Sequence, residues 1–171
     1  PSERAGASVR FGEFAAGCAA VRDVVQDGLA PANCRLIDAR EAALTFAGDG
    51  RSHLLVLGFE GALARERLAR ALALCGGEAE ERSSSGAAWR EAFLRAPYLR
   101  DTLVAMGVVS ETFETAITWD RLDALVERVR EAVPDGIVTC RLTHAYPDGA
   151  APYFTVLAPG RYPNLGGMSG R

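Results

Sequence analysis

The chain of 171 residues is long enough for one domain, and its 49% hydrophobic and 24% charged residues are ordinary for a soluble globular protein. Its net charge of -3 gives no reason to expect nucleic-acid binding, and no apolar run reaches the roughly 18 residues of a membrane-spanning helix. All 19 basic residues are arginine, which excludes lysine chemistry such as a Schiff base.

The N-terminal part of the chain contains one well-marked helix. Residues 1–10 lack the apolar stretch of a secretory signal, and we expect them to be a flexible segment. The absence of a starting Met suggests that the chain was trimmed from a longer one. A helix is predicted over residues 11–28, because Gly28 suits the left-handed C-cap. Its apolar residues recur at the spacing of one helix face, namely Phe14, Cys18, Val21 and Val25.

Strands and helices then follow one another through the middle of the chain. Short apolar runs bounded by turn residues predict strands, and apolar residues three or four positions apart predict helices. In chain order we expect a strand at Cys34–Ile37, a helical turn at Arg40–Thr45, a strand at His53–Phe59, a helix at Gly61–Leu74, and helices from about Ala87 and from Pro97 to Met106. The Ser-rich stretch 78–86 is expected to be a strand edge or a mobile loop.

The last third of the chain contains a strand, a helix and a hairpin. A strand is predicted at Val108–Ile117, and Thr118 is a candidate N-cap for the helix that follows. Two further strands, Ile137–Tyr146 and Pro152–Leu157, are separated by a stretch containing Pro, Asp and Gly, which is typical of a turn.

This order of elements predicts an α+β domain with helices covering one face of a mainly antiparallel sheet. Two strand–helix–strand units raise the possibility of a ferredoxin-like arrangement. We therefore expect one domain over residues 11–160, followed by an irregular Gly-rich tail over residues 161–171.

The sequence offers little for metal or nucleophile chemistry. Its four cysteines form no C-x-x-C pair, and we expect them to be reduced, buried and apolar in a cytosolic setting. His53 opens an apolar strand and is expected to be structural, whereas His144 is compatible with either face of its strand. Because H-E-x-x-H and G-x-S-x-G motifs are also absent, we expect neither a bound metal nor a self-contained hydrolase.

Two arginines and a tyrosine lie in contexts that permit chemistry. Arg35 is inside an apolar strand, where it must reach solvent, pair with Asp38 or bind an anion. Arg100 precedes Asp101 and either pairs with it or contacts a ligand. Tyr153 is on the last strand, where a phenol is either structural or a proton donor and acceptor. Taken singly, these residues leave both interpretations open.

Four stretches of the chain, considered together, resemble one family. They are FAAGCAAVRDVVQDGLAPANCRLID from Phe14, APYLRD from Ala96, FETAITWDRL from Phe113 and CRLTHAYPDGAAPYFT from Cys140. They resemble the alkyldihydroxyacetone-phosphate synthase branch of the FAD-linked oxidase superfamily, over nearly the whole chain. The F-E-T-x-x-x-W-D-R pattern is among the most specific of these matches.

The resemblance implies a two-part enzyme with an N-terminal FAD-binding domain and a C-terminal cap, to which this chain corresponds. The sheet of the cap covers the flavin ring and binds substrate. In the synthase, a long-chain alcohol replaces the fatty acid of acyl-dihydroxyacetone phosphate. The R-L-x-D and Y-x-R-D motifs imply that Arg35 and Arg100 bind a phosphate or carboxylate, with Arg100 also catalytic. The Y-F motif implies that Tyr153 is a catalytic proton-transfer residue, whereas Glu114 and Trp119 match structural positions.

The chain departs from the family in two respects. It has no flavin-binding half, and the histidine-rich segment expected downstream of Tyr153 is absent, so we expect the chain alone to hold FAD weakly and to be inactive. A small-molecule substrate, the chain's own flavin-binding domain and a second copy in a homodimer are the expected partners. The expected location is cytoplasmic or membrane-peripheral.

Two alternative functions stay open. One is part of an FAD-dependent 2-hydroxy-acid dehydrogenase, for which lactate or glycolate would bleach the yellow flavin of the full enzyme. The other is a non-catalytic ferredoxin-like module that binds a ligand, which the lack of a neighbouring flavin-domain reading frame would favour.

Overall fold

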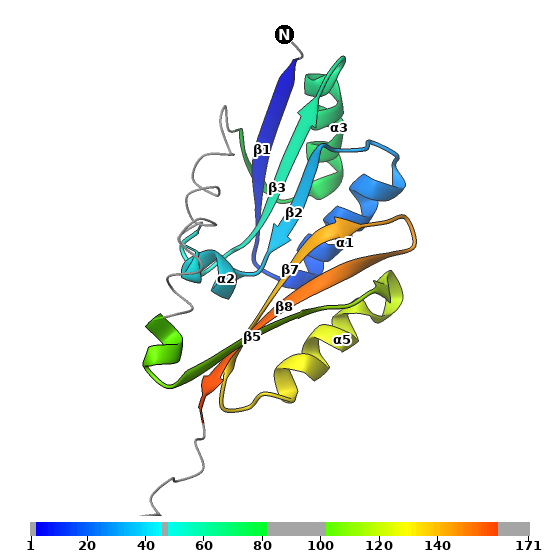
Figure 1. Ribbon diagram of the computed structural model, residues 1–171. Coiled ribbons are helices and arrows are strands. Elements are labelled where there is room, and N and C mark those ends of the chain that lie inside the picture. Colours follow the sequence, from blue (N-terminus) through cyan, green and yellow to red (C-terminus); the bar gives the residue numbers. More distant parts are fainter. Residues whose placement is uncertain (1–2, 46–47, 82–101, 161–171) are drawn as a thin grey trace, which may run out of the picture.

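The computed structural model describes residues 3–45, 48–81 and 102–160, which form one layered domain (Figure 1). The strands are β1 (Arg4–Phe11), β2 (Asn33–Ile37), β3 (His53–Glu60), β4 (Glu78–Glu81), β5 (Val108–Glu114), β6 (Ile117–Thr118), β7 (Ile137–Ala145) and β8 (Gly149–Pro159). The helices are α1 (Phe14–Gln26), α2 (Ala39–Leu44), α3 (Ala64–Cys75) and α5 (Trp119–Glu131). No helix of these described residues is long and apolar enough to cross a membrane.

All eight strands belong to one sheet, in which each described pairing is antiparallel. The order is β4-β1-β3-β2-β7-β8-β5, and β6 pairs with β8. The first half of the chain runs β1-α1-β2-β3-α3-β4, which is the ferredoxin-like succession with α2 inserted. Strands β7, β8 and β5 extend this unit beyond β2. The predicted α+β class with a mainly antiparallel sheet is confirmed.

The prediction of a flexible N-terminal segment over residues 1–10 is wrong for the residues that form β1. This strand pairs with β3 over eight residue pairs and with β4 on its other side. Ala7, Val9 and Phe11 alternate into the core. The segment contains Ala, Gly and Ser, which have a weak preference for strands. The sequence therefore shows no clear indication of β1. Because β1 extends to Phe11, α1 begins later than predicted.

Other predicted boundaries need smaller corrections. The single strand predicted at Val108–Ile117 is divided into β5 and β6, and β8 is longer than the predicted Pro152–Leu157. Thr118 occupies the N-cap position of α5, but its side chain makes no capping hydrogen bond. The helix predicted from Ala87 and the tail over residues 161–171 lie outside the described residues.

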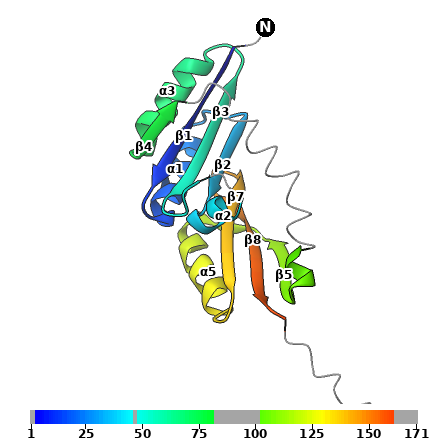
Figure 2. The same ribbon diagram turned by 90° about the vertical axis from the view of Figure 1, so that its left-hand side faces the viewer.

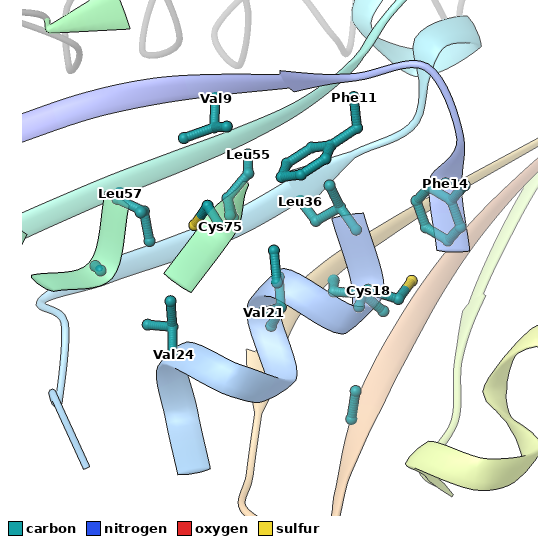
Figure 3. Close-up of a cluster of buried hydrophobic side chains, with 14 of the residues drawn as sticks. Val9, Phe11, Phe14, Cys18, Val21, Val24, Leu36, Leu55, Leu57 and Cys75 are labelled. Atoms are coloured by element: carbon teal, nitrogen blue, oxygen red, sulfur yellow. The ribbon is translucent and has the colours of Figure 1, made fainter. Parts of the chain in front are cut away.

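Helices α1, α3 and α5 pack on one face of the sheet and share one hydrophobic core (Figure 2). Figure 3 shows the side chains of α1, among them Val21 and Val24, directed toward Leu36, Leu55 and Leu57 of the strands. The absence of a side chain at Gly17 allows the close approach of α1 to β2, because a Cβ there would lie 2.7 Å from the Leu36 side chain.

The cysteines contribute to this apolar interior. Cys18, Cys75 and Cys140 are buried, Cys34 is partly buried, and all four are free thiols. Burial raises the pKa of the Cys18 and Cys34 thiols to about 12 and that of Cys75 to about 11. The thiols are therefore protonated at neutral pH and poor nucleophiles, in line with their predicted role as small apolar residues.

Helix α2 packs against β3 and β7 and is held at its first residue by His53. The backbone N–H of Ala39 donates to His53 Nδ1 over 3.1 Å, and the His53 ring packs against Phe14 with 5.4 Å between ring centroids. Burial lowers the pKa of His53, which favours the neutral ring that this hydrogen bond requires. The predicted structural role of His53 is confirmed.

Candidate functional site

The sheet has a second face, opposite α1, α3 and α5, which we call the Tyr153 face. Side chains alternate along a strand, so the burial of Leu142 and Phe154 in the helix-side core places Arg141 and Tyr153 on the other face. Arg141 is the Cα partner of Tyr153 in the β7–β8 ladder and of Ile37 in the β2–β7 ladder. Arg35 precedes Ile37 by two positions and shares its face. Two predicted site residues, Arg35 and Tyr153, thus lie on adjoining parts of one surface.

Tyr153 is stacked against a guanidinium group. The Cζ atom of Arg141 lies 3.9 Å from the centroid of the Tyr153 ring, within the range of a cation–π contact. Arg141 Nη1 also donates to Glu41 Oε1 over 2.6 Å, and Thr139 Oγ1 donates to Glu41 Oε2 over 3.0 Å. The Glu41–Arg141–Tyr153 stack therefore connects α2 to β8 across β7.

Arg35 and Arg141 concentrate positive charge beside the tyrosine. Burial lowers the pKa of Arg35, the charge of Arg141 lowers it further, and Glu41 partly opposes both effects. An arginine remains protonated at physiological pH even so. A guanidinium group is well suited to bind an anionic phosphate or carboxylate group.

Asp38, the acidic residue of R-L-I-D, anchors this region rather than lining it. Its Oδ1 accepts from the Glu41 backbone N–H over 2.7 Å and so caps α2. Its Oδ2 accepts from the Cys140 backbone N–H over 2.8 Å and lies 3.5 Å from Arg130 Nη2. Asp38 is only 1% exposed. One buried carboxylate therefore joins β2, α2, β7 and α5.

His144 lies on the Tyr153 face as well, which decides between the two orientations left open by the sequence. Leu142 and His144 are two positions apart and would share a face in a regular strand. A register shift between them directs Leu142 toward the core and His144 toward the opposite face. His144 Nδ1 is 3.1 Å from Glu114 Oε1, and Glu114 is the β5 partner of Tyr153. The family resemblance implies a structural role for Glu114, and in the structure its side chain contacts His144 on the Tyr153 face.

A cavity of about 530 Å³ opens where β2 and β7 separate. The two strands pair only at Leu36–Leu142 and Ile37–Arg141, and Figure 1 shows the β7–β8 hairpin diverging from β2 beyond that point. Arg35 and His144 are among the residues that line the cavity. The space next to Arg35 is therefore large enough for part of a small molecule.

The sequence predictions and the residues of this site agree only in part. Arg100 lies outside the described residues. No group of His, Cys, Asp and Glu suited to a metal occurs within the described ranges. Arg141 and Glu41 were not singled out in the sequence. The only signal for Arg141 was its place in the strand before the hairpin, and the register shift obscured its position opposite Tyr153.

A protein-family model matches almost the whole chain, and part of the chain is similar to a known enzyme. Residues 1–161 match the family model described as FAD linked oxidases, C-terminal domain. An alignment of 67 positions is 39% identical to alkyldihydroxyacetonephosphate synthase of Caenorhabditis elegans, and it covers 33% of this chain and 11% of that protein.

Solved structures share the fold over almost the whole chain. Two crystal forms of alkyldihydroxyacetonephosphate synthase superpose with TM-scores of 0.78 and 0.79 at 21% and 20% identity, covering 94% of this chain and 37% and 36% of theirs. The isoeugenol complex of 4-ethylphenol oxidase from Gulosibacter chungangensis superposes with a TM-score of 0.62 at 9% identity, covering 91% of this chain and 39% of the oxidase. The chain thus spans little more than a third of these structures.

Proposed function

The chain belongs to the FAD-linked oxidase C-terminal domain family, and from this premise we propose that its Tyr153 face forms the substrate side of a flavin site. The observation that carries the proposal is that Arg35, Arg141 and Tyr153 share one sheet face, where Arg141 stacks on Tyr153 and Arg35 lines a cavity of about 530 Å³. Cations and a phenol on one surface supply an anion-binding group and a proton-transfer group together.

The chain fits FAD in part. The arginine pair and the tyrosine suit the reacting end of a flavin site, where an anionic substrate must be held and a proton moved. The Gly-rich fingerprint that cradles a dinucleotide pyrophosphate is absent from the sequence, which supports FAD being held mainly by another domain. When bound, the flavin would supply an electron-accepting ring.

We assign the following roles to this chain's residues. Arg35 binds the phosphate or carboxylate of the substrate, together with Arg100. Tyr153 accepts or donates a proton at its phenol oxygen as the substrate reacts. The chain alone is inactive, because the flavin comes from the second domain.

The substrate class that we favour is that of an alkylglycerone-phosphate synthase, a phosphate-bearing and lipid-linked small molecule. The 39% identity to the nematode synthase over 67 aligned positions supports it. The 2-hydroxy-acid dehydrogenase alternative predicts bleaching of the flavin by lactate or glycolate, whereas a synthase predicts none. Assembly as a homodimer and a cytoplasmic or membrane-peripheral location remain part of the proposal.

Replacing Arg35 with Gln is expected to raise the KM for a phosphate-bearing substrate roughly ten- to a hundredfold, because a charged hydrogen bond contributes about 1.5–3 kcal/mol. The measurement is steady-state kinetics of the complete, flavin-loaded protein. Arg70→Gln is the matched control, since Arg70 pairs with the exposed Asp27 on the helix side at 2.9 Å. An unchanged KM in Arg35→Gln would contradict the proposal.

A further inference from the structure

We propose that Arg141, held by Glu41, is a positioning residue that fixes the orientation of the Tyr153 ring. The catalytic consequence of this positioning rests on the proposed function. The contact between Arg141 and Tyr153 does not, because it is present whatever the activity of the protein. Its basis is the pair of contacts made by one guanidinium group, 3.9 Å from the Tyr153 ring centroid and 2.6 Å from Glu41 Oε1.

The tyrosine needs such a support. A side chain on a sheet surface commonly adopts either of two χ1 rotamers, which would move the phenol oxygen by several ångströms. Tyr153 is partly exposed, so close packing alone does not restrict its ring. A guanidinium plane against one side of the ring favours a single orientation. A proton-transfer group must be held close to its productive position, because small displacements slow the reaction strongly.

The position of Arg141 is in turn fixed by its ion pair with Glu41. Glu41 is 5% exposed, and its second oxygen accepts from Thr139, so the carboxylate that fixes Arg141 has little freedom. Glu41 lies in the first turn of α2, where Asp38 accepts from its backbone N–H. A chain of contacts thus connects the acidic residue of R-L-I-D to the catalytic phenol through α2. Arg35 has a different place, since it lines the cavity between β2 and β7.

The first test is independent of activity. The 171-residue chain is labelled with 3-fluorotyrosine and observed by ¹⁹F NMR, in which Tyr153→Phe assigns one of its four tyrosine resonances. Arg141→Met is expected to shift the Tyr153 resonance. Arg70→Met, which breaks the ion pair with Asp27 on the helix side, is expected to leave the Tyr153 resonance unshifted. If Arg141→Met is poorly folded, Arg141→Lys replaces it, because a lysine retains the ion pair with Glu41 and loses the planar stack.

An unshifted Tyr153 resonance in a folded Arg141 variant would overturn the inference. The second test uses kinetics of the flavin-loaded protein. Arg141→Lys is expected to lower kcat roughly ten- to a hundredfold with KM unchanged, because a misplaced group impairs the reaction rather than binding. A raised KM with unchanged kcat would make Arg141 a substrate-binding residue and overturn its positioning role.

The two proposals fail in different ways. Full turnover by Tyr153→Phe would refute the proposed function, while the ¹⁹F shift would still show whether Arg141 orders the ring. An inactive Tyr153→Phe combined with an unaffected kcat in Arg141→Lys would refute the positioning role alone. Glu41→Gln is expected to reproduce the Arg141→Lys phenotype in weaker form, because an amide still accepts from Arg141 without its charge.

Discussion

Replacing Tyr153 with Phe is expected to abolish turnover of the complete, flavin-loaded protein while its fold and its bound flavin are retained. The change removes one hydroxyl group and leaves the ring that stacks on Arg141. The β7–β8 ladder around it is also unchanged, because strand pairing uses backbone atoms. Loss of a general acid or base typically slows a reaction by about 10²–10⁴-fold. Turnover and flavin absorbance, measured on the same sample, separate lost chemistry from lost flavin.

Tyr146→Phe is the control for this experiment. Tyr146 lies beyond the end of β7 and is 54% exposed, so the same chemical change there should leave turnover unaffected. Wild-type turnover in Tyr153→Phe would refute the catalytic role of the phenol. Loss of flavin together with loss of activity would show that the hydroxyl supports the cofactor site instead.

Replacing Asp38 with Ala is expected to lower the free energy of unfolding by about 2–5 kcal/mol, because a lost helix cap costs about 0.5–2 kcal/mol and a buried donor without its acceptor about 1–3 kcal/mol. The substitution removes the cap of α2 and leaves the buried Cys140 backbone N–H without its acceptor. It also removes one of the two carboxylates that pair with Arg130, which then keeps only its ion pair with Glu127. The loss should therefore loosen the junction of β2, α2, β7 and α5 at once.

Urea unfolding of the 171-residue chain measures this effect as a shift of the transition midpoint. Asp27→Ala is the matched control, because Asp27 also pairs with an arginine but at the exposed end of α1, and its midpoint should stay close to that of the unchanged chain. Equal midpoints for Asp38→Ala and Asp27→Ala would show that Asp38 does not anchor the sheet.

The elements that the sequence predicts best are those with a strong apolar pattern. The apolar face predicted over residues 11–28 and the run His53–Phe59 both correspond to observed elements, α1 and β3. Strand β1 could not be recognised, because Ala and Gly pack well in this interior without showing a strand preference. The ferredoxin-like unit was therefore predicted without its first strand.

The candidate site was predictable only in part. The motif matches identify Arg35 and Tyr153, and the sheet brings both to one face. Arg141 and Glu41 could not be identified from the sequence. Their contact joins positions 100 residues apart, and the pairing of Arg141 with Tyr153 lies beyond the register shift near Leu142. A bulge of this kind follows from tertiary packing and leaves no distinct sequence signal.

The most direct test of the central claim is a crystal structure of the complete, FAD-loaded protein. We expect the flavin ring to lie against the Tyr153 face, with the phenol of Tyr153 and the guanidinium of Arg35 directed toward the space where substrate binds. A flavin ring placed against α1, α3 and α5, or distant from Tyr153, would contradict the claim that this sheet face is the substrate side of the site.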